Sequence, residues 1–300
     1  MNKPTNKTII ETYLRHFNHS VQSQNMRKSS LNYFFGEKYF NFQDNVFNIN
    51  TDQLIDYFDW LKTQDISLTT KKNKWTILVS FLNSTMEYYR KYKFIVVIPK
   101  HSINWGNGHK KAVSNKNVIA TKEEIIKILE YLKTRNYKHY LIVRLFIETG
   151  CRKGFMINAL YSDVNTEKRL IESNGKTGDK VYYFSKNLAT HLEMWISNRK
   201  TENSKYLFIT KQKKGYGNRA FNLILKSACE QIGITKKITC HTFRRTINTL
   251  RKQMGCPNED RKILLNHKVN DVNIQSYTIL EYENFIQLYD TWNPYKELKL

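Results

Sequence analysis

Two side chains of this 300-residue sequence, His241 and Arg244, stand three positions apart at the start of a predicted helix. Residues at i and i+3 share one face of a helix, so the two side chains point the same way. Arginine offers a planar fork to two oxygens of a phosphate, and histidine offers a hydrogen bond or a proton. The pair therefore has the chemistry of a phosphate site, although a motif this short is also common as an incidental or structural pair.

Three other short segments carry residues of related chemistry. Arg152 follows a glycine that is expected to end a helix, and Lys176 lies in the tight turn Gly175-Lys176-Thr177-Gly178. His267 ends the segment Leu264-Leu265-Asn266-His267, and Tyr277 follows it ten positions later. Taken singly, each residue also fits an ordinary role: a surface charge, a solvated turn lysine or a half-buried aromatic ring.

The elements that must position these residues are mostly helical. Thr8-x-x-Glu11 and Thr121-x-x-Glu124 fit capping boxes, each with apolar residues following at helical spacing. The apolar spacing predicts further helices over residues 27–40, 51–61, 69–92, 137–149, 152–160, 186–198, 218–232, 242–254, 259–265, 271–279 and 281–292. Residues 169–172 and 180–184 are predicted to be strands of a β-hairpin around the Lys176 turn. The expected fold class is mainly α, with a small antiparallel β-hairpin sheet.

The domain organisation follows from a change of composition near residue 99. Residues 1–98 are expected to form a small helical domain, 99–118 a basic linker with little periodicity, and 119–300 a second domain ending in a tail helix. The predicted helix 69–92 carries Lys71, Lys72 and Lys74 opposite its apolar side. A solvated face is the favoured interpretation of these lysines, and a phosphate-contacting face is the alternative.

The charge balance narrows the class of partner. The chain has 49 Lys and Arg against 26 Asp and Glu, a net charge of +23, and both predicted domains share the excess. A folded, aromatic-rich protein of this charge is expected to bind a polyanion, with nucleic acid favoured over a membrane surface because no apolar run is long enough to span a bilayer. The four widely spaced cysteines suit a reduced cytoplasm and are expected to be small core residues rather than metal ligands or disulfides.

Taken in order, these segments resemble the tyrosine recombinase (phage integrase) family. The resemblance runs from about Thr121 to Tyr277 and is carried by Thr149-Gly150-Cys151-Arg152, Lys176-Thr177-Gly178, His241-Thr242-Phe243-Arg244, Leu264-Leu265-Asn266-His267 and Ser276-Tyr277. It implies a two-domain architecture, a helical core-binding domain followed by an integrase catalytic domain. Two-domain relatives of this kind include Xer-type resolvases and small mobile-element integrases.

The resemblance also implies a role for each matched residue. Arg152 and Arg244 are expected to clamp the phosphate and Tyr277 to attack it, which forms a 3′-phosphotyrosyl link. Lys176 is expected to protonate the leaving 5′ oxygen, His241 to assist proton transfer at the tyrosine, and His267 to hydrogen-bond the phosphate. This chemistry needs no cofactor and no metal. The implied function is site-specific cutting and rejoining of double-stranded DNA, with self-association on DNA as a tetramer and possible exchange of the C-terminal helix between protomers.

The sequence departs from the family pattern at two positions. Phe155 stands where many members carry an acidic residue, and Asn266 replaces the usual glycine before His267. Tyr282, Tyr289 and Tyr295 compete with Tyr277 as nucleophile, and Tyr277 is favoured by its distance from His267. The alternative functions are relaxation of DNA of the type IB topoisomerase kind, and binding of DNA by a relative that has lost catalysis.

Overall fold

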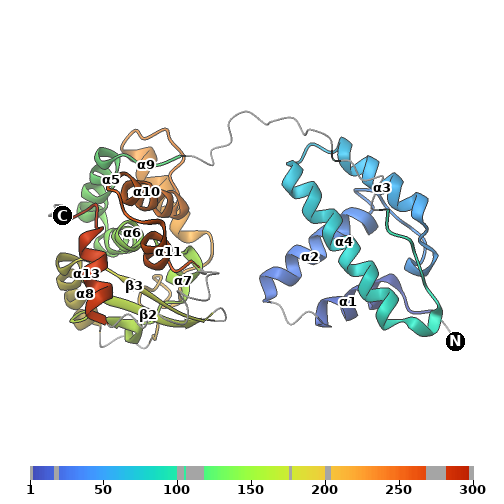
Figure 1. Cartoon of the computed structure of the whole chain (residues 1–300), viewed down its shortest axis with the longest axis horizontal. Helices are drawn as coiled ribbons and strands as arrows, with labels where there is room; N and C mark the ends of the chain where they lie inside the picture. The colour runs from blue at the N-terminus through green and yellow to red at the C-terminus, as the bar shows by residue number, and fades with distance from the viewer. Residues whose placement is uncertain are drawn as a thin grey trace. The chain divides into compact units, whose positions relative to one another are not determined.

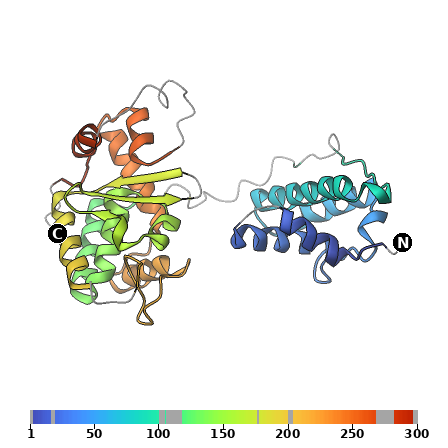
Figure 2. The ribbon, with the colours of Figure 1, turned by 90° about the horizontal axis from the view of Figure 1, so that it is seen from below.

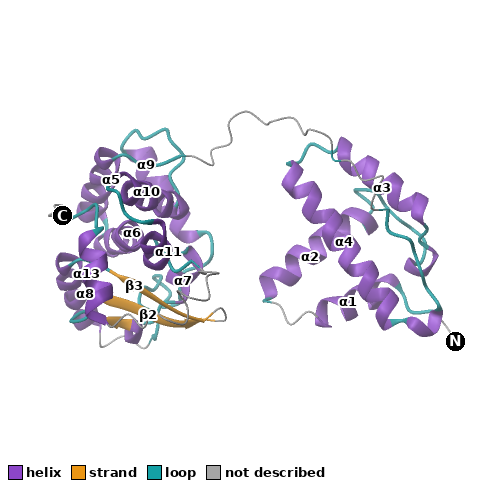
Figure 3. Ribbon diagram, viewed as in Figure 1, coloured by secondary structure: helices purple, strands orange, loops and turns teal. Residues whose placement is uncertain are grey.

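The computed structural model describes residues 3–16, 20–99, 105, 118–175, 178–199, 204–267 and 282–296. The chain forms two compact units, Met1–Val113 and Ser114–Leu300, and the division falls inside the segment assigned above to a linker. In the described part of the chain, helices dominate and one small sheet is confined to the second unit (Figure 1, Figure 3). The expected fold class is therefore confirmed.

The first unit is a helical domain with its own hydrophobic core. Its helices are α1 (Asn6–His16), α2 (Val21–Phe35), α3 (Thr51–Thr63) and α4 (Leu68–Tyr88), with the 3-10 turns η1 (Val46–Asn48) and η2 (Arg90–Tyr92). The apolar stripe predicted for α3 is buried at Leu54, Tyr57, Phe58 and Leu61, because these positions return to one side of the helix every three or four residues.

The N-terminus of α1 differs from the sequence prediction. The helix begins at Asn6, so Thr8 lies inside its first turn, and the backbone N–H of Thr8 donates to Thr5 Oγ1 at 3.3 Å. Thr5 therefore takes the capping role that the pattern assigned to Thr8. At α5 the expected capping box is confirmed, with Thr121 and Glu124 each accepting the other's backbone N–H.

One of the three lysines predicted to share a face of α4 is buried. Lys74 has 7% of its surface exposed, and its ammonium group lies 3.1 Å from the centre of the Tyr33 ring. The aromatic face attracts the cation while the long aliphatic stem packs in the core, and burial lowers the pKa of Lys74. Lys74 therefore stabilises the domain and does not lie on an exposed face of α4 with Lys71 and Lys72.

The second unit carries the remaining elements. Its helices are α5 (Lys122–Arg135), α6 (Tyr137–Thr149), α7 (Lys153–Asn158), α8 (Lys186–Arg199), α9 (Ala220–Gln231), α10 (Cys240–Gln253), α11 (Asn258–Leu264) and α13 (Tyr282–Thr291), with the 3-10 turn η4 (Tyr161–Asp163). Helix α6 is buried along nearly its whole length and forms the centre of the core. The helix predicted over residues 271–279 lies outside the described residues.

The sheet has three antiparallel strands in the order β1-β2-β3, with β1 Val164–Asn165, β2 Leu170–Gly175 and β3 Gly178–Tyr183. The predicted hairpin is present with longer strands, and β1 adds a short third strand that the sequence did not predict. Gly175 pairs with Gly178 at the end of the β2–β3 ladder, and residues 176 and 177 lie outside the described residues.

The two faces of the sheet meet different parts of the second unit. Successive side chains of a strand point to opposite faces, so Tyr182 enters the core while Tyr183 points outward and stacks on Phe285 of α13, with ring centres 5.8 Å apart. Figure 2 shows the strands crossing this unit, with the green helices on one side and the red α13 on the other. Helix α13 thus covers the outer face of the sheet of its own domain.

The four cysteines are buried and unpaired, which confirms their expected place in the core. Among the described helices, none combines the length and the apolar character that a bilayer crossing requires.

Candidate phosphate-binding site

The site begins at the glycine that ends α6. Gly150 has φ +62°, a left-handed conformation that favours glycine, and a Cβ there would come within 2.8 Å of side-chain atoms of both Ile247 and Leu265. The absence of a side chain lets this turn pack directly against α10 and the end of α11. Arg152, two residues later, is thereby held close to Arg244 and to the turn that carries His267.

Arg244 is the buried arginine of the pair, with 5% of its surface exposed. Its Nη1 donates to the Gly150 carbonyl at 2.7 Å and its Nη2 to the Leu265 carbonyl at 2.6 Å. A guanidinium has five N–H donors, so two backbone carbonyls fix its plane without using all of them. Burial and the nearby Arg152 lower the pKa of Arg244, although the group stays charged at neutral pH.

Arg152 is exposed and lies at the start of α7. Its Nη1 donates to the carbonyl of Asn266 at 3.3 Å. The turn formed by residues 265–267 therefore receives one hydrogen bond from each arginine, which brings both guanidinium groups to one place.

The two candidate histidines share the same electrostatic surroundings. Burial lowers the pKa of His241, and Arg245, Arg244 and Arg152 lower it further. Burial likewise lowers the pKa of His267, and the positive charges of Arg244, Arg152, Lys180 and Lys262 lower it further, in that order. Every charge that shifts these two histidines is positive, among the residues the structure describes. Such a concentration of positive charge around exposed hydrogen-bonding groups is suited to an anion.

Phe155, which stands where many family members carry an acidic residue, packs against Tyr182. The Phe155 ring meets Tyr182 edge to face at 4.8 Å, and Tyr182 is 1% exposed. Burial raises the pKa of the Tyr182 hydroxyl, while Arg244 and Arg152 act to lower it, so the hydroxyl lies beside the arginine pair. An uncharged phenol, packed against the Phe155 ring, therefore lies next to the arginines.

Asn266, the second departure from the family pattern, has a backbone conformation that a glycine could also adopt. Its φ is +49°, in the left-handed region that glycine adopts freely and that asparagine tolerates better than most residues. Its side chain bonds to the backbone of β3, and a glycine has no atoms to make that contact.

Four of the six predicted site residues are thus brought together: Arg152, His241, Arg244 and His267. Lys176 and Tyr277 lie outside the described residues. Two of the competing tyrosines are poorly placed for nucleophilic attack, because Tyr289 and Tyr295 are 1% and 4% exposed and burial raises the pKa of both. The Tyr289 hydroxyl also donates to Glu148 Oε2 at 3.3 Å.

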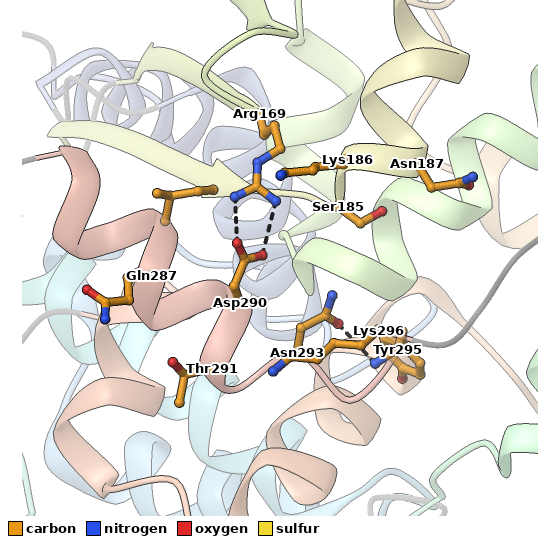
Figure 4. Close-up of a pocket in the computed structure, with 11 residues that line it drawn as sticks. Arg169, Ser185, Lys186, Asn187, Gln287, Asp290, Thr291, Asn293, Tyr295 and Lys296 are labelled. Carbon is orange, nitrogen blue, oxygen red and sulfur yellow. Dashed lines mark hydrogen bonds and ion pairs between the residues drawn. The ribbon is translucent and has the colours of Figure 1, made fainter.

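Two further contacts hold α13 and the residues after it on their own domain. Arg169, in the turn between β1 and β2, donates to both carboxylate oxygens of Asp290 at 3.0 and 2.7 Å (Figure 4). Arg251 is 1% exposed, and its Nε donates to the Trp292 carbonyl at 3.2 Å. In this structure the last helix therefore rests on the domain to which it belongs.

Sequence reasoning missed Tyr182, Lys180 and the side-chain role of Asn266. The alternation of β3 would have placed Tyr182 on the inner face, and this signal was available once the strand was recognised. No local pattern places Asn266 beside β3, because the two are far apart in the chain.

Comparison with known proteins identifies the class to which this geometry belongs. Residues 119–284 match the phage integrase family, which covers more than half of the chain. The chain belongs to this family, the tyrosine recombinases, as the order of its motifs indicated.

Two curated relatives are archaeal proteins called tyrosine recombinase XerA. The protein of Pyrococcus furiosus is 29% identical over 152 residues, 49% of this chain and 52% of the relative. The protein of Saccharolobus solfataricus is 26% identical over 197 residues, 63% of this chain and 64% of the relative. The match therefore spans between half and two thirds of the length of these relatives.

Solved structures of the same fold cover nearly the whole chain. The Tn1549 transposon integrase in complex with transposon right end DNA superposes with a TM-score of 0.68 at 13% identity, covering 96% of this chain and 99% of that one. XerH site-specific recombinase bound to its difH substrate gives a TM-score of 0.65 at 16% identity, covering 96% and 82%. A lambda integrase tetramer bound to a Holliday junction gives 0.63 at 13% identity, covering 93% and 81%. At these identities the likeness establishes the fold.

Proposed function

We propose that this protein is a site-specific DNA recombinase that cuts and rejoins duplex DNA through a tyrosyl intermediate. The observation that carries the proposal is the convergence of Arg152, His241, Arg244 and His267 on one site, where every described charge acting on the histidines is positive. A phosphodiester in a reaction without a metal needs this surrounding, because negative charge builds on its oxygens in the transition state.

In the first step the two arginines hold the non-bridging oxygens, and Arg244 is fixed for this by the carbonyls of Gly150 and Leu265. The Tyr277 oxygen attacks phosphorus, forming the tyrosyl P–O bond while the bond to the 5′ oxygen breaks. His241 takes the tyrosine proton, and its lowered pKa keeps it neutral and able to do so near pH 7. His267 donates a hydrogen bond to the phosphate.

The leaving 5′ oxygen takes a proton from Lys176, which gives a free 5′ hydroxyl and a 3′-phosphotyrosyl link. Rejoining reverses these transfers: a 5′ hydroxyl attacks phosphorus and loses its proton to Lys176, and Tyr277 leaves with a proton from His241. Each step exchanges one phosphate ester bond for another of similar energy, so no external energy source is needed.

Double-stranded DNA is the proposed partner of both units. Residues 1–98 form the proposed core-binding domain and 99–118 the basic linker, and the excess of positive charge in both parts of the sequence supports a grip from two sides. The proposed active assembly is a tetramer on DNA. Helix exchange in this assembly transfers α13 from the seat on its own domain to the identical seat on a neighbour, which preserves the Arg169–Asp290 pair.

The test uses the Tyr277→Phe variant, which removes one oxygen and keeps the aromatic ring. The target is first selected from a pool of random duplexes by binding to the wild-type protein. Labelled, nicked target is then incubated with each protein, and adducts are resolved on denaturing gels and mapped to a peptide. We expect an adduct at Tyr277 in the wild type, none in the variant, and equal binding.

Each other outcome has a defined meaning. An adduct that persists in Tyr277→Phe would move the nucleophile to another tyrosine. A wild-type protein that binds its target without forming an adduct is a DNA-binding relative without catalysis. Relaxation of supercoiled DNA that carries a single site, with no exchange between two sites, indicates a topoisomerase-like activity.

A further inference from the structure

A pair of hydrogen bonds joins the turn of the phosphate-binding site to the edge of the sheet. Asn266 Nδ2 donates to the Val181 carbonyl at 2.6 Å, and the Val181 N–H donates to Asn266 Oδ1 at 3.2 Å. One side-chain amide thus pairs with both backbone groups of a single strand residue, in the way that a neighbouring strand would.

The register of the hairpin explains why these backbone groups are free to pair. The Phe184 N–H donates to the Arg169 carbonyl, so these two residues form a hydrogen-bonded pair next to the β2–β3 ladder. Hydrogen-bonded and non-hydrogen-bonded pairs alternate along an antiparallel ladder, and Val181 falls in a non-hydrogen-bonded pair with Glu172 of β2. Its N–H and carbonyl therefore point away from β2. Since β3 is at the edge of the sheet, no strand among the described residues pairs with them. Asn266 supplies the missing partner.

The same turn also contacts both arginines. The carbonyl of Leu265 accepts from Arg244, the carbonyl of Asn266 accepts from Arg152, and His267 is the next residue. If this turn moves relative to β3, the two arginines therefore move relative to the β2–β3 hairpin. Val181 lies three residues after Gly178, at which the hairpin connection containing Lys176 closes.

We propose that Asn266 is a positioning residue that fixes the β2–β3 hairpin to the phosphate-binding site, so that Lys176 is delivered to the leaving oxygen. This inference rests on the proposed function, in which Lys176 is the general acid. A glycine at position 266 keeps the left-handed backbone and both carbonyl contacts and loses only the bonds to Val181. We call this pair of hydrogen bonds the Asn266–Val181 clamp, and the Asn266→Gly variant removes it alone.

The experiment compares two nicked substrates that differ in one atom, a 5′ oxygen or a 5′ bridging sulfur at the cleaved bond. Sulfur leaves without protonation, so it removes the need for a general acid. We expect Asn266→Gly to slow cleavage of the oxygen substrate about tenfold, less than the hundredfold scale of losing an acid outright. With the sulfur substrate its rate should return to within about twofold of wild type, and the double variant with Lys176→Ala should be no slower than Lys176→Ala alone.

Two further variants make the test specific. Val181→Pro removes the N–H donor from the other side of the contact; an edge strand tolerates it because this N–H is not used in the ladder. It should reproduce the selective defect. Asn165→Gly is the matched control, since Asn165 belongs to the same sheet and its Oδ1 accepts from the Lys168 N–H at 2.8 Å, in the turn after β1. It should cleave both substrates at the wild-type rate.

Hydrogen exchange of residues 178–183 tests the clamp without reference to chemistry. We expect faster amide exchange at these residues in Asn266→Gly than in wild type, while the exchange rates in the helices of the second unit stay unchanged. Unchanged exchange in this hairpin would overturn the proposal, as would equal slowing of both substrates. If instead Lys176→Ala is not restored by sulfur, the assignment of the acid in the proposed function fails, while the exchange data still decide whether Asn266 holds the hairpin.

Discussion

The two arginines of the site should respond differently to the same truncation. Arg244 is buried and bonded to two backbone carbonyls, whereas Arg152 is exposed and makes one bond of 3.3 Å. Alanine at either position removes a preorganised donor to the phosphate. Only alanine at 244 also leaves two carbonyls without their partner and opens a space in the core.

The magnitudes follow from these contacts. Hydrogen bonds to a charged group contribute about 1.5–3 kcal/mol each. Because burial disfavours the charged form of Arg244, removing the charge offsets part of the loss, and we expect Arg244→Ala to destabilise the second unit by about 2–3 kcal/mol. For a domain of this size that corresponds to a fall in Tm of roughly 4–12 °C. Arg152→Ala should change stability by no more than about 0.5 kcal/mol. Both variants should lose cleavage by about a hundredfold or more.

The assay pairs thermal unfolding with adduct formation on the nicked target, measured well below the Tm of every variant. Arg244→Lys serves as a control, since a point charge reaches neither both carbonyls nor both phosphate oxygens and should rescue only in part. Cleavage within a few-fold of wild type in both alanine variants would refute the phosphate site. Equal thermal stability of Arg244→Ala and wild type would refute the structural role of the buried guanidinium.

Three other results are expected. DNA affinity should fall steeply with salt, with a log–log slope more negative than roughly −4, because both units release counterions, and a nearly flat response in a filter-binding titration would contradict the two-sided grip. The pKa values of His241 and His267 lie below the ordinary 6.5, so the unfolded chain binds protons more readily than the folded chain. The contribution of these histidines to the free energy of unfolding should be fully present above pH 6.5 and decline as the pH falls through that value. In urea titrations the His267→Gln variant should show a smaller decline than the wild type. If α13 is exchanged between protomers, the Asp290→Arg and Arg169→Asp variants should each weaken assembly on DNA in a gel-shift assay. An equal mixture of the two variants should recover part of the assembly, because each helix then meets an oppositely charged seat on its neighbour. A mixture that assembles no better than the single variants would place the helix on its own domain in the assembly.

Much of this protein was determined by local sequence. Capping boxes, apolar residues at helical spacing and the glycine-flanked hairpin turn indicated the mainly helical fold with one small sheet, because these patterns reflect interactions between residues close in the chain. The order of the short motifs indicated the family. The candidate site residues followed from that order, since an arginine, a histidine or a lysine taken singly has many ordinary roles.

Only the tertiary structure decided which side chains meet and which are buried. Spacing on α4 grouped Lys74 with Lys71 and Lys72, but packing against Tyr33 buries Lys74. The carbonyl partners of Arg244 and the Asn266–Val181 clamp join segments that are distant in the chain. Such contacts depend on how whole elements pack, and a periodic pattern records only which face of an element is apolar. For this reason the sequence indicates the chemistry of the phosphate site, while the fold determines how rigidly it is held.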